Sequence, residues 1–215
     1  MEVLFLVDLH WTEKRALELP PLDDIDLVLL GGDLTNFRGA ETARTIVEAI
    51  RAAGPRVLSV CGNCDRPEME AYLRDEDIDL DRRRREVSGV DIVGISAGLP
   101  FGDLPYERSE DEFRAAARDA FAGTGERPTV LVSHQPPRGT RCDLVGGRHV
   151  GSQAVREAVL EHGPDLVLCG HLHEAVATDR LGTAVVVNPG PWFAGNSFRF
   201  RIAEGRVDLE PAAAG

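Results

Sequence analysis

The segment Glu2–His10, which reads EVLFLVDLH, decides the fold of the chain. Its apolar centre has the length of a single buried strand, so we predict a β-strand over Glu2–Asp8. An aspartate and a histidine, Asp8 and His10, stand where this strand ends. Open α/β sheets bind their ligands at the carboxyl ends of their strands. The segment therefore predicts both a strand and a ligand site at its end.

The first half of the chain alternates such strands with helical patterns. Strands are predicted over residues 26–31 and 56–61. Helices are predicted over residues 40–53 and 67–74, and a short helical stretch near residues 12–19. Gly54-Pro55 ends the first of these helices. Strands that alternate with helices are typical of parallel βαβ units.

The second half mixes a hairpin, helices and short strands. Residues 83–87 and 91–96 flank Ser88-Gly89 and predict a hairpin. We predict helices over residues 110–122 and 152–162, and strands over residues 129–133, 165–169, 175–178, 184–188, 197–202 and 206–209. This order predicts an α/β fold of mixed type, a four-layer αββα sandwich of two mixed β-sheets flanked by helices. We expect one domain over residues 1–215.

Composition and charge exclude several classes of protein. The chain has 215 residues, 43% of them hydrophobic, which suffices for a buried core. No apolar run approaches the roughly 18 residues that span a bilayer, and we expect neither a membrane segment nor a secretory leader. The net charge of −12 argues against binding to nucleic acid. Four cysteines without a leader do not predict disulfides, so we expect a cytoplasmic protein.

The basic residues are almost all arginine. Lys14 is the single lysine among 24 basic residues, against 36 acidic ones. One explanation is adaptation to a high-salt cytoplasm, where excess negative charge keeps a protein hydrated and its self-repulsion is screened. The other is a GC-rich genome that favours arginine codons.

The two explanations predict different responses to salt. If the acidic surface is a high-salt adaptation, the melting temperature should climb steeply between low salt and molar KCl, because salt screens the repulsion between surface carboxylates. A thermal melt at several KCl concentrations measures this. A melting temperature that stays constant across the range would favour the codon explanation.

Polar residues recur in glycine-rich turns where the predicted strands end. Each motif alone is more often a turn or a cap than a site. Together they are unlike a chance placement, because four of the six histidines occur in them. The motifs are Asp8-Leu9-His10, Gly31-Gly32-Asp33, Gly62-Asn63-Cys64-Asp65, Ser133-His134 and Gly170-His171-Leu172-His173.

These residue types suit a site for two metal ions. Residues i and i+2 that leave a strand face the same way, so Asp8 can converge with His10, and His171 with His173. Carboxylate and imidazole ligands favour Mn²⁺, Fe²⁺, Co²⁺, Ni²⁺ or Zn²⁺. Two such ions lie roughly 3.5–4 Å apart and need a shared ligand, for which Asp33 has two oxygens. A bridging hydroxide would be the nucleophile, and the residual positive charge would attract a phosphate ester.

The five motifs, in this order, closely resemble those of the calcineurin-like metallophosphoesterase superfamily. Within it the chain is similar to small stand-alone prokaryotic and archaeal phosphoesterases. The resemblance implies the αββα fold and two divalent ions, Mn²⁺ first among the candidates. It implies that one ion is held by Asp8, His10, Asp33 and His173. It implies that the other is held by Asp33, Asn63, His134 and His171.

The resemblance also implies a catalytic group, with one departure from the family pattern. The group comprises Asp33, Asn63, Cys64, Asp65 and His134. Many relatives have a histidine after the asparagine, where it can protonate the leaving group. Cys64 stands there in this chain. We therefore expect poor leaving groups to react slowly.

Other motifs have alternative interpretations. Cys61-Gly62-Asn63-Cys64 also spells a Cys-x-x-Cys redox motif, but its central residues fit the phosphoesterase turn. The run 82–85 of four arginines favours a solvated strand edge over a phosphate site. His149 could contact a substrate phosphate, although a surface histidine is the simpler interpretation.

We predict a dinuclear-metal-dependent phosphoesterase, in particular a phosphodiesterase that hydrolyses a small phosphate ester. The alternatives are a phosphomonoesterase or nucleotidase, and a catalytically weak binding scaffold on the same fold. The scaffold would predict substitutions among the seven ligand positions, and the sequence has none. A homo-oligomer is compatible with the sequence. The natural substrate depends on loops whose shape the sequence leaves open.

Overall fold

The computed structural model describes residues 1–209, and its first strand lies at the centre of a five-stranded sheet. This strand, β1 (Glu2–Leu6), pairs in parallel with β2 (Leu27–Leu30), which pairs in parallel with β3 (Arg56–Ser59). On its other side, β1 pairs antiparallel with β12 (Phe198–Ala203), which pairs with β13 (Arg206–Leu209). The interior strands β1 and β2 are buried on both faces, as their continuous apolar runs predict.

The second sheet has six strands in the order β10-β11-β9-β6-β5-β4. Its four central strands are parallel, and an antiparallel strand forms each edge. The strands are β4 (Arg84–Val87), β5 (Val90–Ile95), β6 (Thr129–Ser133), β9 (Leu166–Leu168), β10 (Ala177–Leu181) and β11 (Ala184–Asn188). A two-stranded hairpin of β7 (Leu144–Val145) and β8 (Arg148–His149) lies apart from both sheets.

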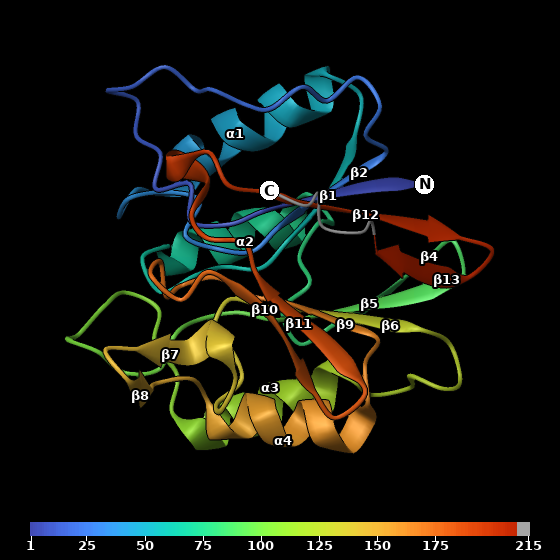
Figure 1. The fold of residues 1–215 in the computed structure, drawn as a ribbon. Helices are drawn as coiled ribbons and strands as arrows, with labels where there is room; N and C mark the ends of the chain where they lie inside the picture. Colours follow the sequence, from blue (N-terminus) through green and yellow to red (C-terminus); the bar gives the residue numbers. More distant parts are fainter. Residues whose placement is uncertain (210–215) are drawn as a thin grey trace.

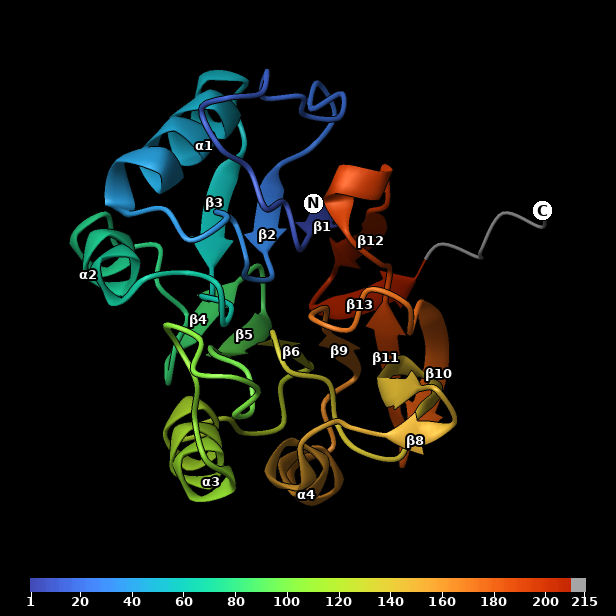
Figure 2. The same cartoon turned by 90° about the vertical axis from the view of Figure 1, so that its left-hand side faces the viewer.

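Helices cover the outer face of each sheet (Figure 1). The first sheet carries α1 (Ala40–Ala52) and α2 (Pro67–Asp75), and the second carries α3 (Glu110–Ala120) and α4 (Gln153–His162). Figure 2 shows α3 and α4 end-on and side by side under the second sheet. Ser109 caps α3 through a capping box with Glu112, which satisfies amides that a helix start leaves unpaired. Two short 3-10 helices, Arg141–Asp143 and Trp192–Ala194, complete the described elements.

Three apolar layers hold the sandwich together. Val3 and Phe5 of β1 face the second sheet, whereas Leu4 and Leu6 face the helices on the first, in the alternation that a strand imposes. A third layer, which includes Phe113, lies between the second sheet and its helices. The predicted four-layer αββα sandwich of two mixed sheets is confirmed. The predicted domain 1–215 ends in residues 210–215, which lie outside the described residues.

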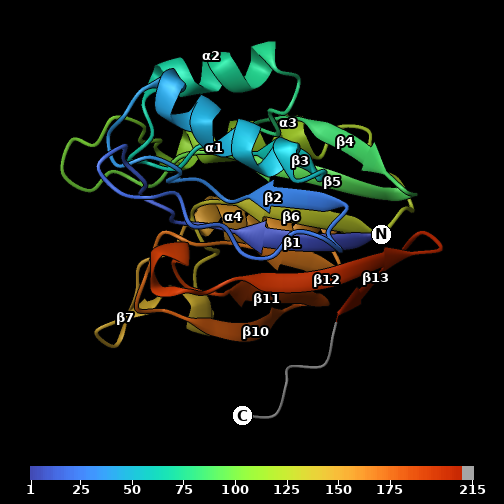
Figure 3. The same ribbon diagram turned by 90° about the horizontal axis from the view of Figure 1, so that it is seen from above.

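The parallel strands bring their carboxyl ends to one side of the molecule. Figure 3, which looks down on the sandwich, shows β1 and β2 pointing the same way. The turns that follow them therefore lie next to one another at one edge of the sheet. This edge is where the sequence predicts the ligand site.

The predicted helical stretch near residues 12–19 is wrong. After a single turn, in which the amide of Arg15 donates to the carbonyl of Thr12, the segment has no regular structure. Two indole N–H groups use its carbonyls: Trp11 Nε1 donates to Arg15 O at 3.1 Å, and Trp192 Nε1 donates to Glu18 O at 3.0 Å. These side-chain hydrogen bonds, one local and one from a distant part of the chain, use carbonyls that a helix would pair with its own backbone amides.

The strand predicted over residues 175–178 is shifted. The observed strand β10 starts two residues later, because the amide of Ala175 closes a turn on the carbonyl of Leu172. The strand then continues to Leu181, where a tight turn through Gly182 leads into β11. None of the helices within residues 1–209 has the length and apolar composition that crossing a bilayer requires.

Candidate metal centre

The turns after β1 and β2 carry three of the predicted ligands in unusual backbone conformations. Asp8 has φ 54°, His10 has φ 44° and Asp33 has φ 47°, in the left-handed region that L-residues rarely adopt. Two hydrogen bonds join the turns: the amide of Asp8 donates to Gly32 O at 3.1 Å, and that of His10 donates to Asp33 O at 2.9 Å. His171, after β9, is likewise left-handed with φ 67°. Strain of this kind concentrates at functional sites.

Two glycines allow the turns to approach one another. A Cβ at Gly32, whose φ is +97°, would lie 2.5 Å from the amide nitrogen of Gly62 and 2.7 Å from His134 Nδ1. A Cβ at Gly62 would lie 2.2 Å from Asp33 Oδ1. Both contacts are far below van der Waals distance. The glycines of the Gly-Asp and Gly-Asn motifs are therefore packing requirements of the site.

One group of converging ligand atoms comes from Asp8, His10 and His173. The three ligand atoms lie within 4.8 Å of one another. The Nε2 atoms of His10 and His173 are 3.3 Å apart, and Asp8 Oδ1 is 3.8 Å from His173 Nε2. Asp8 Oδ2 accepts the backbone amide of His171, whereas Asp8 Oδ1 is buried without a hydrogen-bond partner. A buried carboxylate oxygen without a donor is costly unless a cation contacts it.

A second group comes from Asp33, His134 and His171. His134 Nδ1 donates to Gly31 O at 2.9 Å, which leaves Nε2 as the unprotonated nitrogen of the neutral ring. That Nε2 lies 2.9 Å from Asn63 Oδ1 and 3.5 Å from Asp33 Oδ2. When the His134 ring is neutral, its Nε2 and these two oxygens are three acceptor atoms that face one another, an arrangement that a cation between them would stabilise.

Asp33 connects the two groups. Its Oδ2 atom lies 3.5 Å from His10 Nε2 and also 3.5 Å from His134 Nε2. Its other oxygen accepts the backbone amide of Cys64 at 2.7 Å, which fixes the carboxylate in this position. Asp33 therefore places one carboxylate oxygen at the same distance from an imidazole nitrogen of each group.

The electrostatics of the group also suit cations. Burial alone would raise the pKa of Asp33, but His134 and His10 hold it well below its ordinary range. Burial lowers the pKa of His171 to about 4, helped by the nearby His134, so this imidazole is neutral at pH 7. In His134 the charge of Asp33 outweighs burial and raises the pKa. Metal ions require unprotonated imidazole, so binding displaces any proton held there.

The sequence of the chain places this site in a known family. A model of the calcineurin-like phosphoesterase superfamily domain matches residues 1–199. The chain belongs to the calcineurin-like phosphoesterase superfamily. The curated relative MJ1162, an uncharacterised protein of Methanocaldococcus jannaschii, is 30% identical to this superfamily member over 204 residues, 89% of this chain and 88% of the relative.

Solved structures show the same fold. One crystal structure superposes with a TM-score of 0.76 at 16% identity and covers 97% of this superfamily member and 98% of its own chain. TT1561 of Thermus thermophilus superposes with a TM-score of 0.64 at 16% identity, covering 88% and 89% of the two chains. A dimetal phosphatase of Danio rerio superposes with a TM-score of 0.59 at 12% identity, covering 94% and 93%.

Cys64 and Asp65 complete the predicted catalytic group, and their surroundings differ. Cys64 is nearly buried, and its Sγ lies within 4.8 Å of ligand atoms of His10 and Asp33. Burial raises the pKa of this thiol, and the charge of Asp33 raises it further. Asp65 is fully buried and accepts the amides of Leu34, Thr35 and Gly62 at 3.3, 3.0 and 2.9 Å. Its carboxylate thus joins the turns that carry Asp33 and Asn63.

Three other motifs form contacts outside the two ligand groups. Cys61 packs into the layer under α1 and α2, whereas Cys64 lies near His10 and Asp33. His149 pairs with Asp143 at 2.8 Å on the second sheet's side. The four arginines 82–85 form ion pairs with Asp119, Asp79, Asp91 and Asp77. Each of these arginines is therefore paired with a carboxylate of the same chain, in agreement with the interpretation of residues 82–85 as a solvated strand edge.

Sequence reasoning missed one neighbour of the site, Phe193. Its ring centroid lies 5.8 Å from that of His10 and 5.2 Å from that of His173. It is nevertheless 51% exposed. The signal was the pair Trp192-Phe193 directly after Asn188-Pro189-Gly190-Pro191, which follows a strand as the ligand motifs do.

Proposed function

We propose that the chain is a phosphoesterase that works with two divalent metal ions and prefers phosphodiesters. The observation that supports this most is the position of Asp33 Oδ2, 3.5 Å from an imidazole nitrogen of each ligand group. One ion would be held by Asp8, His10, Asp33 and His173. The other would be held by Asp33, Asn63, His134 and His171.

The residues fit such ions for a reason that belongs to this structure. The buried oxygen Asp8 Oδ1 has no donor, and His134 Nε2 faces two acceptor oxygens. Bound divalent ions lower the pKa of water and stabilise negative charge on phosphoryl oxygens. Imidazole and carboxylate ligands favour Mn²⁺, Co²⁺ or Ni²⁺ over Mg²⁺. Mn²⁺ as the metal and the cytoplasm as the location stay predictions.

Other groups of the chain hold the proposed metal ligands in position. His134 is oriented by its hydrogen bond to Gly31, and Asp33 by the amide of Cys64. Asp65 holds the two ligand turns in register through backbone amides. Outer partners of this kind fix ligand geometry, and their loss typically costs about 10–100-fold in metal affinity or activity.

Cys64 favours diesters with good leaving groups. A thiol is a weak hydrogen-bond donor, so it protonates a departing alkoxide poorly. Activated aryl diesters need little protonation, whereas alkyl monoesters need it most.

A substrate panel tests the proposal. Metal-loaded protein is assayed on bis(4-nitrophenyl) phosphate, 4-nitrophenyl phosphate and an alkyl monoester. We expect the rates to fall in that order. A faster rate on both monoesters would support the phosphomonoesterase alternative, and hydrolysis of none of the three would contradict the proposal.

Cys64→His should raise turnover of alkyl esters by about 10²-fold and change turnover of nitrophenyl diesters much less, because imidazole is an effective general acid. The measurement is the ratio of the two rates in wild type and variant. Cys64→Ser is the matched control, since a hydroxyl is no better an acid than a thiol. A Cys64→His ratio equal to that of wild type would contradict this role for position 64.

A further inference from the structure

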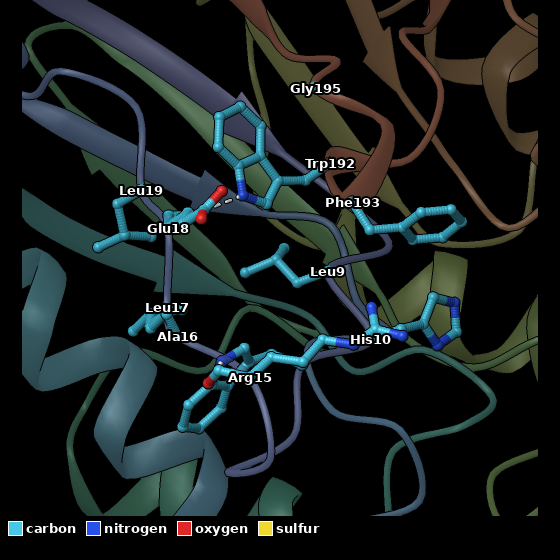
Figure 4. A pocket seen from close by; sticks show the side chains of 11 residues that line it. Leu9, His10, Arg15, Ala16, Leu17, Glu18, Leu19, Trp192, Phe193 and Gly195 are labelled. Atoms are coloured by element: carbon cyan, nitrogen blue, oxygen red, sulfur yellow. Dashed lines mark hydrogen bonds between the residues drawn. The ribbon is translucent and has the colours of Figure 1, made fainter.

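A cleft of about 610 Å³ opens beside the metal centre, and its walls are rich in aromatic rings. His10 lines both the cleft and the metal centre. Figure 4 shows Trp192 and Phe193 on one wall and the segment that contains Arg15 and Leu17 on the other. The volume of the cleft is within the range of about 300–1,000 Å³ typical of small-molecule sites. A group bonded to a phosphate at the metal centre can therefore extend into this cleft.

The rings in the cleft present π surface. The indole N–H groups of Trp11 and Trp192 already donate to the carbonyls of Arg15 and Glu18. What remains of each half-buried ring for a ligand is apolar. Phe193, half exposed, stands at the junction of cleft and metal centre. Aromatic side chains in this arrangement stack on planar ring systems.

Arg15 supplies positive charge at the same junction. Its side chain extends across the cleft toward His10 (Figure 4). Its guanidinium has no carboxylate partner among residues 1–209, in a chain of net charge −12 in which many other arginines are paired. A guanidinium binds phosphate oxygens through a fork of N–H donors.

We propose that this cleft binds the organic group of the substrate, that this group is a planar aromatic ring system such as a nucleobase, and that Arg15 binds an oxygen of the attached phosphate. The inference rests on the proposed function, because it places the phosphate at the metal centre. It narrows the substrate class from phosphate esters in general to those that carry an aromatic ring.

Tryptophan fluorescence tests the inference directly, because both tryptophans of the chain line the cleft. Adenosine 5′-monophosphate is titrated against ribose 5-phosphate, which has the same phosphate and sugar without the base. We expect the adenosine ligand to quench the fluorescence and to bind about tenfold more tightly. We expect the same preference for the adenosine ligand when EDTA has removed metal ions, because the cleft is formed by protein side chains.

Variants distinguish binding of the ring system by the cleft from binding of the phosphate by Arg15. Phe193→Ala and the cleft-filling Ala16→Phe should each remove the preference for the adenosine ligand. Arg15→Gln should weaken both ligands about tenfold and preserve the preference. Ala52→Phe and Arg118→Gln make the same changes at exposed positions on α1 and α3, outside the cleft, and should leave binding unchanged.

The outcomes distinguish this inference from the proposed function. Equal binding of the two ligands by a protein that hydrolyses phosphate esters would overturn the inference alone. Unchanged affinities in Arg15→Gln would overturn the assignment of Arg15. The expected binding pattern in a protein that hydrolyses no ester would support the cleft and contradict the proposed function.

Discussion

Replacing Asp33 by asparagine is expected to lower phosphodiester hydrolysis on the order of 10³-fold and to reduce bound metal below two ions per chain. The reason is the position of Asp33 Oδ2, which lies 3.5 Å from imidazole nitrogens of both ligand groups. An amide has one oxygen and no charge, so it cannot offset the repulsion between two cations. Metal content by mass spectrometry and initial rates measure the two effects together.

The control for this prediction is Asp23→Asn, which removes one carboxylate at an exposed position. It should retain metal content and rate, which excludes a simple effect of net charge. A thermal melt of Asp33→Asn shows whether the fold survives. Full activity of a folded Asp33→Asn protein would contradict the shared-ligand assignment.

Binding of Mn²⁺ should stabilise the fold strongly. At a free concentration about 1,000 times the dissociation constant, one site contributes about 4 kcal/mol to the free energy of unfolding. The gain arises because the folded state brings the ligand atoms together, among them Asp8 Oδ1, which is buried without a donor, whereas the unfolded chain does not. Denaturant unfolding at increasing Mn²⁺ concentration measures the free energy directly.

Two comparisons make this second prediction specific. Ca²⁺ prefers oxygen ligands and should stabilise the wild-type protein much less than Mn²⁺. Asp33→Asn should gain less from Mn²⁺ than the wild type does. An unfolding transition that is the same with and without Mn²⁺ would show that the ligand groups do not bind it.

Much of the fold was predictable because burial on both faces leaves a simple pattern. The strands around Leu4, Leu29 and Leu58 are short apolar runs that end in Gly, Asp or Asn. Such runs predict parallel strands, and the sheet edge then brings the polar residues together. The pairs Asp8 with His10 and His171 with His173 followed from residue spacing, while the division of ligands between two ions followed from the family resemblance.

The cleft was not predictable because it depends on contacts between distant parts of the chain. Trp192 donates to the carbonyl of Glu18, a residue 174 positions away. That contact and the hydrogen bond from Trp11 to Arg15 hold residues 12–19 in an irregular conformation. The spacing of Leu17 and Leu19 in the sequence does not indicate either of these two hydrogen bonds. The hydrogen bonds from three amides of neighbouring turns to Asp65 could not be predicted either, because two of these amides, those of Leu34 and Thr35, are distant in the sequence.

One measurement tests the central claim most directly: the rate of bis(4-nitrophenyl) phosphate hydrolysis by metal-stripped protein as Mn²⁺ is added back, with bound metal counted at each point. We predict no hydrolysis without metal and a rate that rises to its maximum as the second ion binds to each chain. Full hydrolysis by the stripped protein, or a maximal rate with one ion bound, would contradict the account.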